Sequence, residues 1–189
     1  MAKILKKIWI FPILFILVTG WYFSNSDWLY TKWDSRCVFC DESVIGSQTI
    51  YRGEKASILA THKPVVKGHL LVIPNRHVET FDGLTTEELI EMSALVKKAH
   101  FGKEYVLLQK NGILAGQSVP HVHFHLLPRE KEMGLFGFTL RILYGKFLKA
   151  LSKEEMKEYV NELSAMLEGS GHPRYEIGSH EEGLKERAL

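Results

Sequence analysis

The segment that most constrains the fold is the run V-P-H-V-H-F-H-L-L-P, which extends from Val119 to Pro128. Histidines stand at every second position, and apolar residues alternate with them. A period of two is typical of a β-strand with one buried face. The imidazoles of His121, His123 and His125 should therefore share one face, with neighbouring rings about 6.5 to 7 Å apart along the strand. The apolar residues between them should face a core.

A loop rich in polar groups leads into this strand. Gly112 and Gly116 bracket a turn, and Gln117 and Ser118 follow it. Backbone N–H groups, an amide and a hydroxyl gathered beside histidines suit a phosphate group. From the pattern alone, the alternatives are a half-exposed strand that happens to be rich in histidine and an accidental metal-binding surface.

The segment A-G-Q-S-V-P-H-V-H-F-H-L-L-P-R, residues 115 to 129, resembles the signature of the histidine triad nucleotide-binding proteins. The similarity extends upstream through K-P-V-V-K-G-H-L-L-V-I-P-N-R-H, residues 63 to 77, to C-V-F-C at residues 37 to 40. The resemblance implies one α+β domain over residues 37 to 130, an antiparallel sheet of about five strands with helices packed on it. It also implies a homodimer.

The resemblance further implies a hydrolase or nucleotidyl transferase that acts on a phosphoramidate, a dinucleoside polyphosphate or an adenylylated adduct of a nucleoside monophosphate. His123 would attack the α-phosphate and form a nucleotidyl-histidine, while a backbone carbonyl holds its Nδ1–H. An imidazole with an ordinary pKa of about 6.5 is mostly neutral at physiological pH and needs no strong base. The rival interpretations are a nucleotide-binding or zinc-stabilised adaptor without turnover, and a zinc hydrolase that uses H-x-H as ligands. No organic cofactor is expected.

The same resemblance gives supporting roles to several side chains. His125 would donate to phosphate oxygens, and His69 would be a fourth active-site histidine that supports the triad by hydrogen bonding. His121 would belong to the histidine network or to a metal site. Gln117 and Ser118 would hold the phosphate or the leaving group, and Ser118 could protonate the latter.

Two positions depart from the family pattern. Thr61 stands where the family usually has an Asp or Asn that holds the ribose. Lys110, with Asn111 beside it, replaces an Asn or Gln that contacts phosphate. A lysine can still meet a phosphate, but Thr61 makes weaker ribose binding plausible.

Cys37 and Cys40 are the only cysteines in the chain. The C-x-x-C spacing suits a redox pair, a disulfide or half of a zinc site, and a tetrahedral zinc ion requires two further ligands. In zinc-containing members of the histidine triad family these come from the positions of His77 and His121. The resemblance therefore implies a structural zinc on Cys37, Cys40, His77 and His121.

The amino terminus differs in character from the rest. Lys3, Lys6 and Lys7 precede an uncharged stretch over residues 8 to 26, which as a helix would span about 28 Å, close to the hydrocarbon thickness of a bilayer. We expect residues 1 to 24 to be a membrane anchor and residues 25 to 36 a linker. The alternative is a cleaved signal peptide with a cleavage site near Val18-Thr19-Gly20. The lysines favour a domain outside the cytoplasm, but the side of the membrane is left open.

Beyond residue 36 the chain carries 19 basic and 20 acidic residues, which disfavours a nucleic-acid partner. We expect a hairpin over residues 49 to 60, strands over 69 to 74 and 104 to 109, and a helix that begins with a capping box at Thr85 and Glu88. The pattern for residues 131 to 169 indicates an extension that ends in an amphipathic helix, with Ser152 and Glu155 as its capping box. The apolar stretch from 133 to 150 could be a flap, a dimer contact or a membrane-facing surface. Residues 170 to 189 should be a mobile polar tail.

Overall fold

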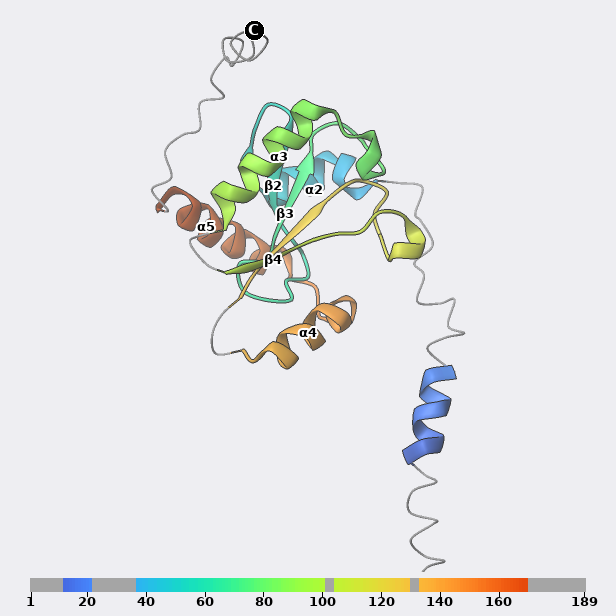
Figure 1. Ribbon diagram of the computed structural model, residues 1–189. Helices are drawn as coiled ribbons and strands as arrows, with labels where there is room; N and C mark the ends of the chain where they lie inside the picture. Colours follow the sequence, from blue (N-terminus) through green and yellow to red (C-terminus); the bar gives the residue numbers. More distant parts are fainter. Residues whose placement is uncertain (1–11, 22–36, 101–103, 130–132, 170–189) are drawn as a thin grey trace, which may run out of the picture.

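The computed structural model describes residues 12–21, 37–100, 104–129 and 133–169 (Figure 1). Its centre is a five-stranded antiparallel sheet with the order β1-β2-β3-β5-β4. This confirms the predicted antiparallel sheet and its strand number. The strands are β1 (Thr49–Arg52), β2 (Ala56–Ala60), β3 (Leu70–Pro74), β4 (Tyr105–Gln109) and β5 (Phe124–Pro128).

Two helices cover the apolar face of the sheet. Alternate side chains of β2, β3 and β5 pack there against α3 (Thr86–Ala99) and α5 (Lys153–Gly169). Together they form the main core, whose fully buried members include Ile58, Leu70, Val72, Met92, Leu126 and Leu163. The opposite face carries a smaller cluster, in which Leu59, Leu71 and Ile73 meet Phe39 and Ile45. Phe39 lies in the short helix η2 (Val38–Cys40), and Ile45 lies in α2 (Glu42–Gln48).

Both predicted capping boxes are present. In α3, the Thr85 hydroxyl accepts from the backbone N–H of Glu88, whose carboxylate accepts from the N–H of Thr85. Ser152 and Glu155 make the same pair of bonds before α5, at 3.2 and 2.6 Å. The box satisfies N–H groups that a helix leaves without partners in its first turn, so these two starts are encoded locally.

The strand that holds the triad begins later than we expected. The regular strand β5 starts at Phe124, so His121 and His123 precede it in an irregular segment. Pro120 has no N–H to give a ladder, and the N–H of Val122 donates instead to the carbonyl of Val78, which lies after the end of β3. The alternation survives this change, because Val122, Phe124 and Leu126 all join the main core.

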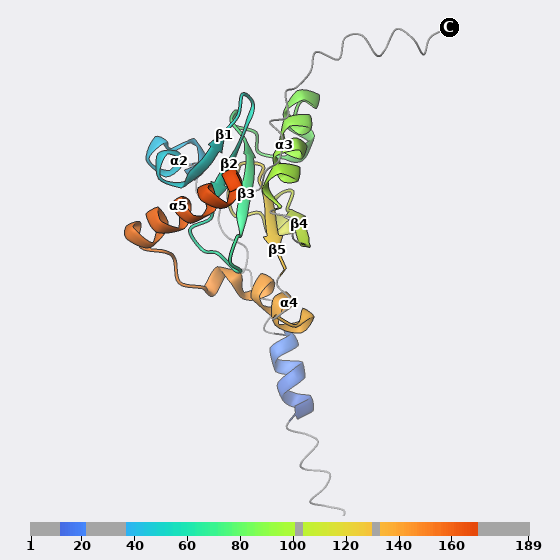
Figure 2. The same ribbon diagram turned by 90° about the vertical axis from the view of Figure 1, so that its left-hand side faces the viewer.

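The extension contains a helix that the pattern did not define. Residues Leu135–Tyr144 form α4, and the helix η5 (Gly145–Phe147) follows it before the chain enters α5. Two views at right angles place α4 at the end of the domain opposite α3 (Figure 2).

The predicted anchor is described only in its middle. Residues 12–21 form a helix, whereas 8–11 and 22–26 lie outside the described residues, as do the linker over 25–36 and the tail over 170–189. Across the described parts of the chain, no helix combines the length and hydropathy needed to cross a bilayer. Membrane attachment stays a prediction from the sequence.

Candidate active site and metal centre

The sheet brings four histidines together on the face opposite the main core. Leu71 of β3 stands opposite His125 of β5, so His69 at the entry to β3 lies near the triad. His69, His121 and His123 are buried, and His125 is half-buried. The rings of His123 and His125 meet edge to face with centroids 4.8 Å apart, closer than the separation we expected from strand geometry. The rings can tilt toward each other because His123 precedes the regular strand.

Hydrogen-bond partners fix the tautomer of His123. Its Nδ1 lies 2.7 Å from the carbonyl oxygen of His121. A carbonyl oxygen only accepts, so the proton sits on Nδ1 and the Nε2 atom keeps a lone pair. His123 is buried, with 5% of its surface exposed.

His125 has the opposite tautomer, set by a relay through His69. The backbone N–H of Val65 donates to Nδ1 of His69 at 3.3 Å, so the proton of His69 is on Nε2. That Nε2–H donates to Nδ1 of His125 at 2.9 Å. The proton of His125 is therefore on its Nε2. The His123 ring thus offers a lone pair on Nε2, and the adjacent His125 ring offers an N–H donor on its own Nε2.

Burial keeps these rings neutral. Burial, together with the charge that His123 would carry, lowers the pKa of His69 to about 3. Burial is also the main cause of the lowered pKa of His123 and of His125, and the Lys110 ammonium lowers both further. Each ring is thus uncharged at physiological pH, as a nucleophilic imidazole must be.

The loop before the triad is held by Gln117. Its buried amide accepts from the N–H of Gly112 at 2.6 Å and donates to the carbonyls of Glu79 and Val119 at 2.8 and 2.9 Å. Gly112 and Gly116 both have positive φ, so this turn favours glycine at each position. The Gln117 amide therefore supports the loop, and its expected contact with phosphate stays a prediction.

The other residues predicted to bind the nucleotide differ in their burial and in their partners. Ser118 is exposed at the end of the loop. Asn111 accepts from the N–H of Phe81 and donates to the Asp82 carboxylate, so its amide is engaged away from the triad. Thr61 is buried at the end of β2, where its hydroxyl accepts from the N–H of Lys63 at 3.5 Å. Their contacts with a nucleotide stay predictions from the sequence.

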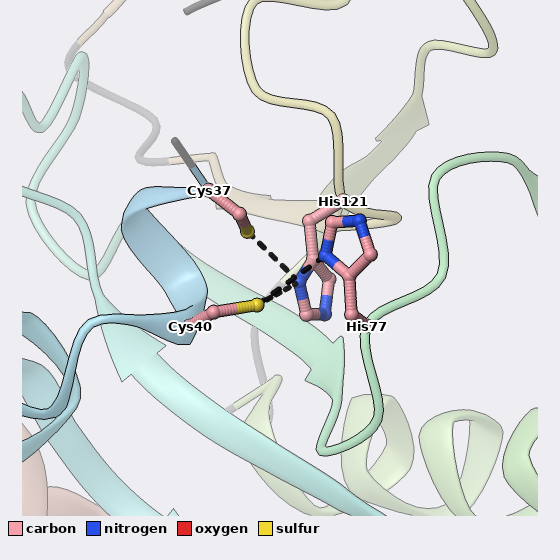
Figure 3. A group of neighbouring side chains, drawn as sticks. All are labelled: Cys37, Cys40, His77 and His121. Carbon is pink, nitrogen blue, oxygen red and sulfur yellow. Dashed lines mark hydrogen bonds between the residues drawn. The ribbon is translucent and has the colours of Figure 1, made fainter. Parts of the chain in front are cut away.

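The four predicted zinc ligands converge on one point (Figure 3). Cys37 and Cys40 come from the η2 segment, His77 from the loop after β3, and His121 from the segment before β5. The Sγ of Cys37 lies 3.3 Å from Nδ1 of His121, and the Sγ of Cys40 lies 3.3 Å from Nδ1 of His77. All four candidate ligand atoms lie within 4.8 Å of one another. A tetrahedral zinc ion with ordinary bond lengths needs ligand separations of about 3.3 to 3.8 Å, and the Sγ–Nδ1 separations of 3.3, 3.3 and 3.8 Å lie in this range.

The outer contacts of the two histidines also suit a metal. Nε2 of His121 donates to the carbonyl of Pro74 at 2.9 Å, which leaves the Nδ1 lone pair directed at the cysteines. Nε2 of His77 lies 3.8 Å from the Glu79 carboxylate. Metal-bound histidines usually place their second nitrogen against a carbonyl or carboxylate in this way. The ring of His121 therefore belongs to the candidate metal cluster, while the backbone carbonyl of His121 accepts from Nδ1–H of His123.

Three contributors were absent from the sequence-based predictions. Phe39 sets its ring against those of His121 and His123, with centroids 5.8 and 5.5 Å apart. The N–H of Val65 fixes the tautomer of His69, as described above. Tyr159 of α5 accepts from the N–H of Gly68 at 3.1 Å. For Phe39, the available signal was its position within C-V-F-C, whereas the other two contacts depend on tertiary structure.

Comparison with known proteins agrees with this arrangement. The HIT domain family matches residues 42–132. A bis(5'-nucleosyl)-tetraphosphatase from Schizosaccharomyces pombe is 38% identical over 94 residues, which cover 46% of this chain and 52% of that protein. The chain therefore spans about half the length of that relative. An adenosine 5'-monophosphoramidase from the same organism is 37% identical over 125 residues, which cover 62% of this chain and 94% of that protein.

Among solved structures, a hypothetical histidine triad nucleotide-binding protein from Sulfolobus tokodaii strain 7 is similar in fold. The TM-score is 0.53 at 26% sequence identity, over 71% of this chain and 91% of that one. This similarity supports the α+β sheet architecture described above.

Proposed function

The chain belongs to the HIT domain family, and from this premise we propose that it hydrolyses a nucleoside monophosphate derivative through a nucleotidyl-histidine on His123. The observation that carries this proposal is the 2.7 Å bond from Nδ1–H of His123 to the carbonyl of His121. It leaves an uncharged Nε2 atom with its lone pair beside the N–H donor of His125. A nucleophile next to a donor for phosphate oxygens is the arrangement that phosphoryl transfer needs.

The chemistry proceeds in two displacements at phosphorus. Nε2 of His123 forms a bond to the α-phosphorus while the bond to the leaving group breaks, and the electron pair departs with that group. The carbonyl of His121 stabilises the positive charge that develops on the ring, through Nδ1–H. Nε2–H of His125 donates to a phosphate oxygen, and Lys110 adds positive charge nearby. Ser118 is the proposed proton donor to the leaving group.

In the second displacement, water attacks the phosphorus of the nucleotidyl-histidine. The bond from phosphorus to Nε2 breaks, its electron pair returns to the ring, and one proton from water returns to Ser118, which gave its own to the leaving group. His123 is then neutral again, and a nucleoside monophosphate is released. Because no side chain is consumed, the cycle can repeat.

The proposal is tested with the full chain and two substrates, AMP phosphoramidate and a diadenosine polyphosphate. These represent the reactions named for the two fission yeast relatives. We expect AMP release from at least one of them, and an alkaline quench should trap AMP on the peptide that contains His123. Binding of both compounds without AMP release would instead favour an adaptor without turnover.

We infer that the four-ligand cluster holds a structural zinc ion. The ligand separations, the outer contacts of His77 and His121, and the two cysteine thiols support this inference. When bound, the ion would cross-link η2, the loop after β3 and the segment before β5. Burial, together with the neighbouring Cys40, raises the pKa of the Cys37 thiol to about 11, so a cation would be needed to hold Cys37 as a thiolate.

We also propose that the protein is a homodimer that associates through β4. This strand forms one edge of the sheet, and Tyr105, Val106 and Leu107 are each about 40% exposed or more. An apolar strand with an open edge is a pairing surface, and a lysine placed on it opposes pairing.

We expect Val106→Lys to raise the dimer dissociation constant at least about tenfold, measured by light scattering over a concentration series. Leu114→Lys, at an 88% exposed position in η4 (Ile113–Ala115), is the matched control and should leave the dimer intact. A monomeric wild type would contradict the proposal.

A further prediction concerns the support that α5 gives to His69. The Tyr159 hydroxyl accepts from the N–H of Gly68 and lies 3.5 Å from the carbonyl of His69, so it holds the turn that places the relay histidine. We expect Tyr159→Phe to lower the free energy of unfolding by about 1 to 3 kcal/mol, because it leaves a buried N–H without its partner. We also expect kcat to fall about threefold to tenfold while KM changes less.

The matched control for Tyr159→Phe is Glu162→Gln. It removes the exposed ion pair between Glu162 and Lys67 on the same helix and turn, and should cost less than about 1 kcal/mol. If both variants lose kcat equally, the effect comes from general loosening of α5 rather than from the hydroxyl.

A further inference from the structure

Helix α4 is mostly apolar, with Arg141 as its one charged residue, but it is buried on only one side. Phe138 is 2% exposed, whereas Leu135, Phe136, Leu143 and Tyr144 are between 49% and 78% exposed. An exposed apolar patch of this kind marks a protein or membrane interaction site. We call the outward surface formed by Leu135, Phe136, Leu140, Leu143, Tyr144 and Phe147 the α4 face.

The inner side of α4 is fixed to the domain, so the α4 face has a defined direction. Phe138 packs with Val65, Val66 and Leu127, and Ile142 and Leu148 add to this cluster. Arg141 donates from Nη1 to the carbonyl of Val65 at 3.2 Å. Gly145 lies so close to Val65 that a Cβ at this position would overlap it. These contacts hold α4 as a packed element, which argues against a flap that opens and closes over the histidines.

The segment of the chain that contains α4 is basic, and the nearest acidic residues along the sequence are Glu132 and Glu154. From residue 133 to residue 153 the chain contains no Asp or Glu, and its charged residues are Arg141, Lys146, Lys149 and Lys153. An interfacial helix typically combines leucine and aromatic side chains with nearby cations that attract anionic lipid. Two copies of the same cationic surface placed face to face around a two-fold axis would instead set like charges against each other.

We propose that the α4 face rests on a membrane surface that contains anionic lipid. Its aliphatic and aromatic side chains enter the boundary between headgroups and acyl chains, and the flanking cations contact phosphate groups. Helix α4 lies at the end of the domain opposite α3, so docking through α4 leaves α3 away from the lipid (Figures 1 and 2). This proposal is independent of the catalytic role of His123.

The test uses the full chain with Phe136 replaced by the photo-crosslinker p-benzoylphenylalanine, mixed with vesicles of phosphatidylcholine and phosphatidylglycerol in equal parts. The matched control carries the same group at Ile90, an exposed apolar position on the outer side of α3. After irradiation, mass spectrometry identifies what each position has captured. We expect a lipid adduct from position 136 and little or none from position 90.

The other outcomes overturn the proposal in distinguishable ways. A crosslinked dimer from position 136 would make a second copy the occupant, and an adduct to the loop beside His123 would make α4 a flap. Equal lipid capture at positions 136 and 90 would show contact without docking of α4, and no capture at position 136 would show a solvated face. Lys149→Gln should lower the lipid adduct at position 136 about fivefold, and an unchanged yield would overturn the choice of anionic lipid.

Discussion

Replacing His123 with alanine should lower the rate of AMP release at least about a thousandfold, because the variant has no atom that can form the covalent intermediate. The His123 ring bonds through Nδ1 to the His121 carbonyl, and it is not among the four candidate metal ligands. We therefore expect the variant to stay folded, to keep its metal content and to bind nucleotide. Steady-state kinetics with AMP phosphoramidate, together with titration of AMP, measures both parts of this expectation.

Replacing His123 with glycine tests whether the imidazole itself is the group that attacks phosphorus. In His123→Gly, added imidazole can occupy the vacated space and attack phosphorus in place of the side chain, so we expect partial recovery of turnover. His125→Ala removes the donor but leaves the nucleophile, and should cost less than His123→Ala. Turnover within tenfold of wild type in His123→Ala would end the proposed mechanism.

The sequence predicted the parts of the fold that are encoded locally. The capping boxes at Thr85 and Ser152 each place a hydroxyl and a carboxylate three residues apart, and this spacing alone defines a helix start. The alternation around His123 places the histidines and the apolar side chains on opposite faces of the sheet, even where the strand is irregular. The metal ligands required the family resemblance, because Cys37 and His121 are separated by more than eighty positions.

The protonation pattern of the site was less accessible to sequence reasoning. The tautomer of His125 depends on the N–H of Val65, which acts through His69 across two strands, and no local pattern contains this information. The same limit applies to α4, whose composition allowed a flap, a dimer contact or a membrane surface. Only the packing of Phe138 and Arg141 shows which side of the helix is covered.

The packing around His121 gives metal removal a large expected effect on stability and a small one on chemistry. Its Nδ1 lone pair faces the two cysteines, while its carbonyl holds the nucleophile. Without a cation, the thiols and two rings would lose the interaction that holds η2 against the histidine face. At metal concentrations of 100 to 1,000 times the dissociation constant, metal binding adds about 2.7 to 4.1 kcal/mol to the free energy of unfolding. Removal of the metal should therefore lower Tm by about 10 °C.

Thermal unfolding of the full chain before and after treatment with a chelator measures this change, with metal content determined on the same samples. Re-addition of zinc should restore Tm. The variant Cys40→Ser should show the same lower Tm in the absence of chelator. At temperatures where the metal-free protein is still folded, we expect AMP release within about threefold of the untreated rate, because His123 and His125 need no metal to react. Abolished turnover in protein that is still folded would instead indicate that the metal activates water, and it would replace the nucleotidyl-histidine with a zinc hydrolase mechanism.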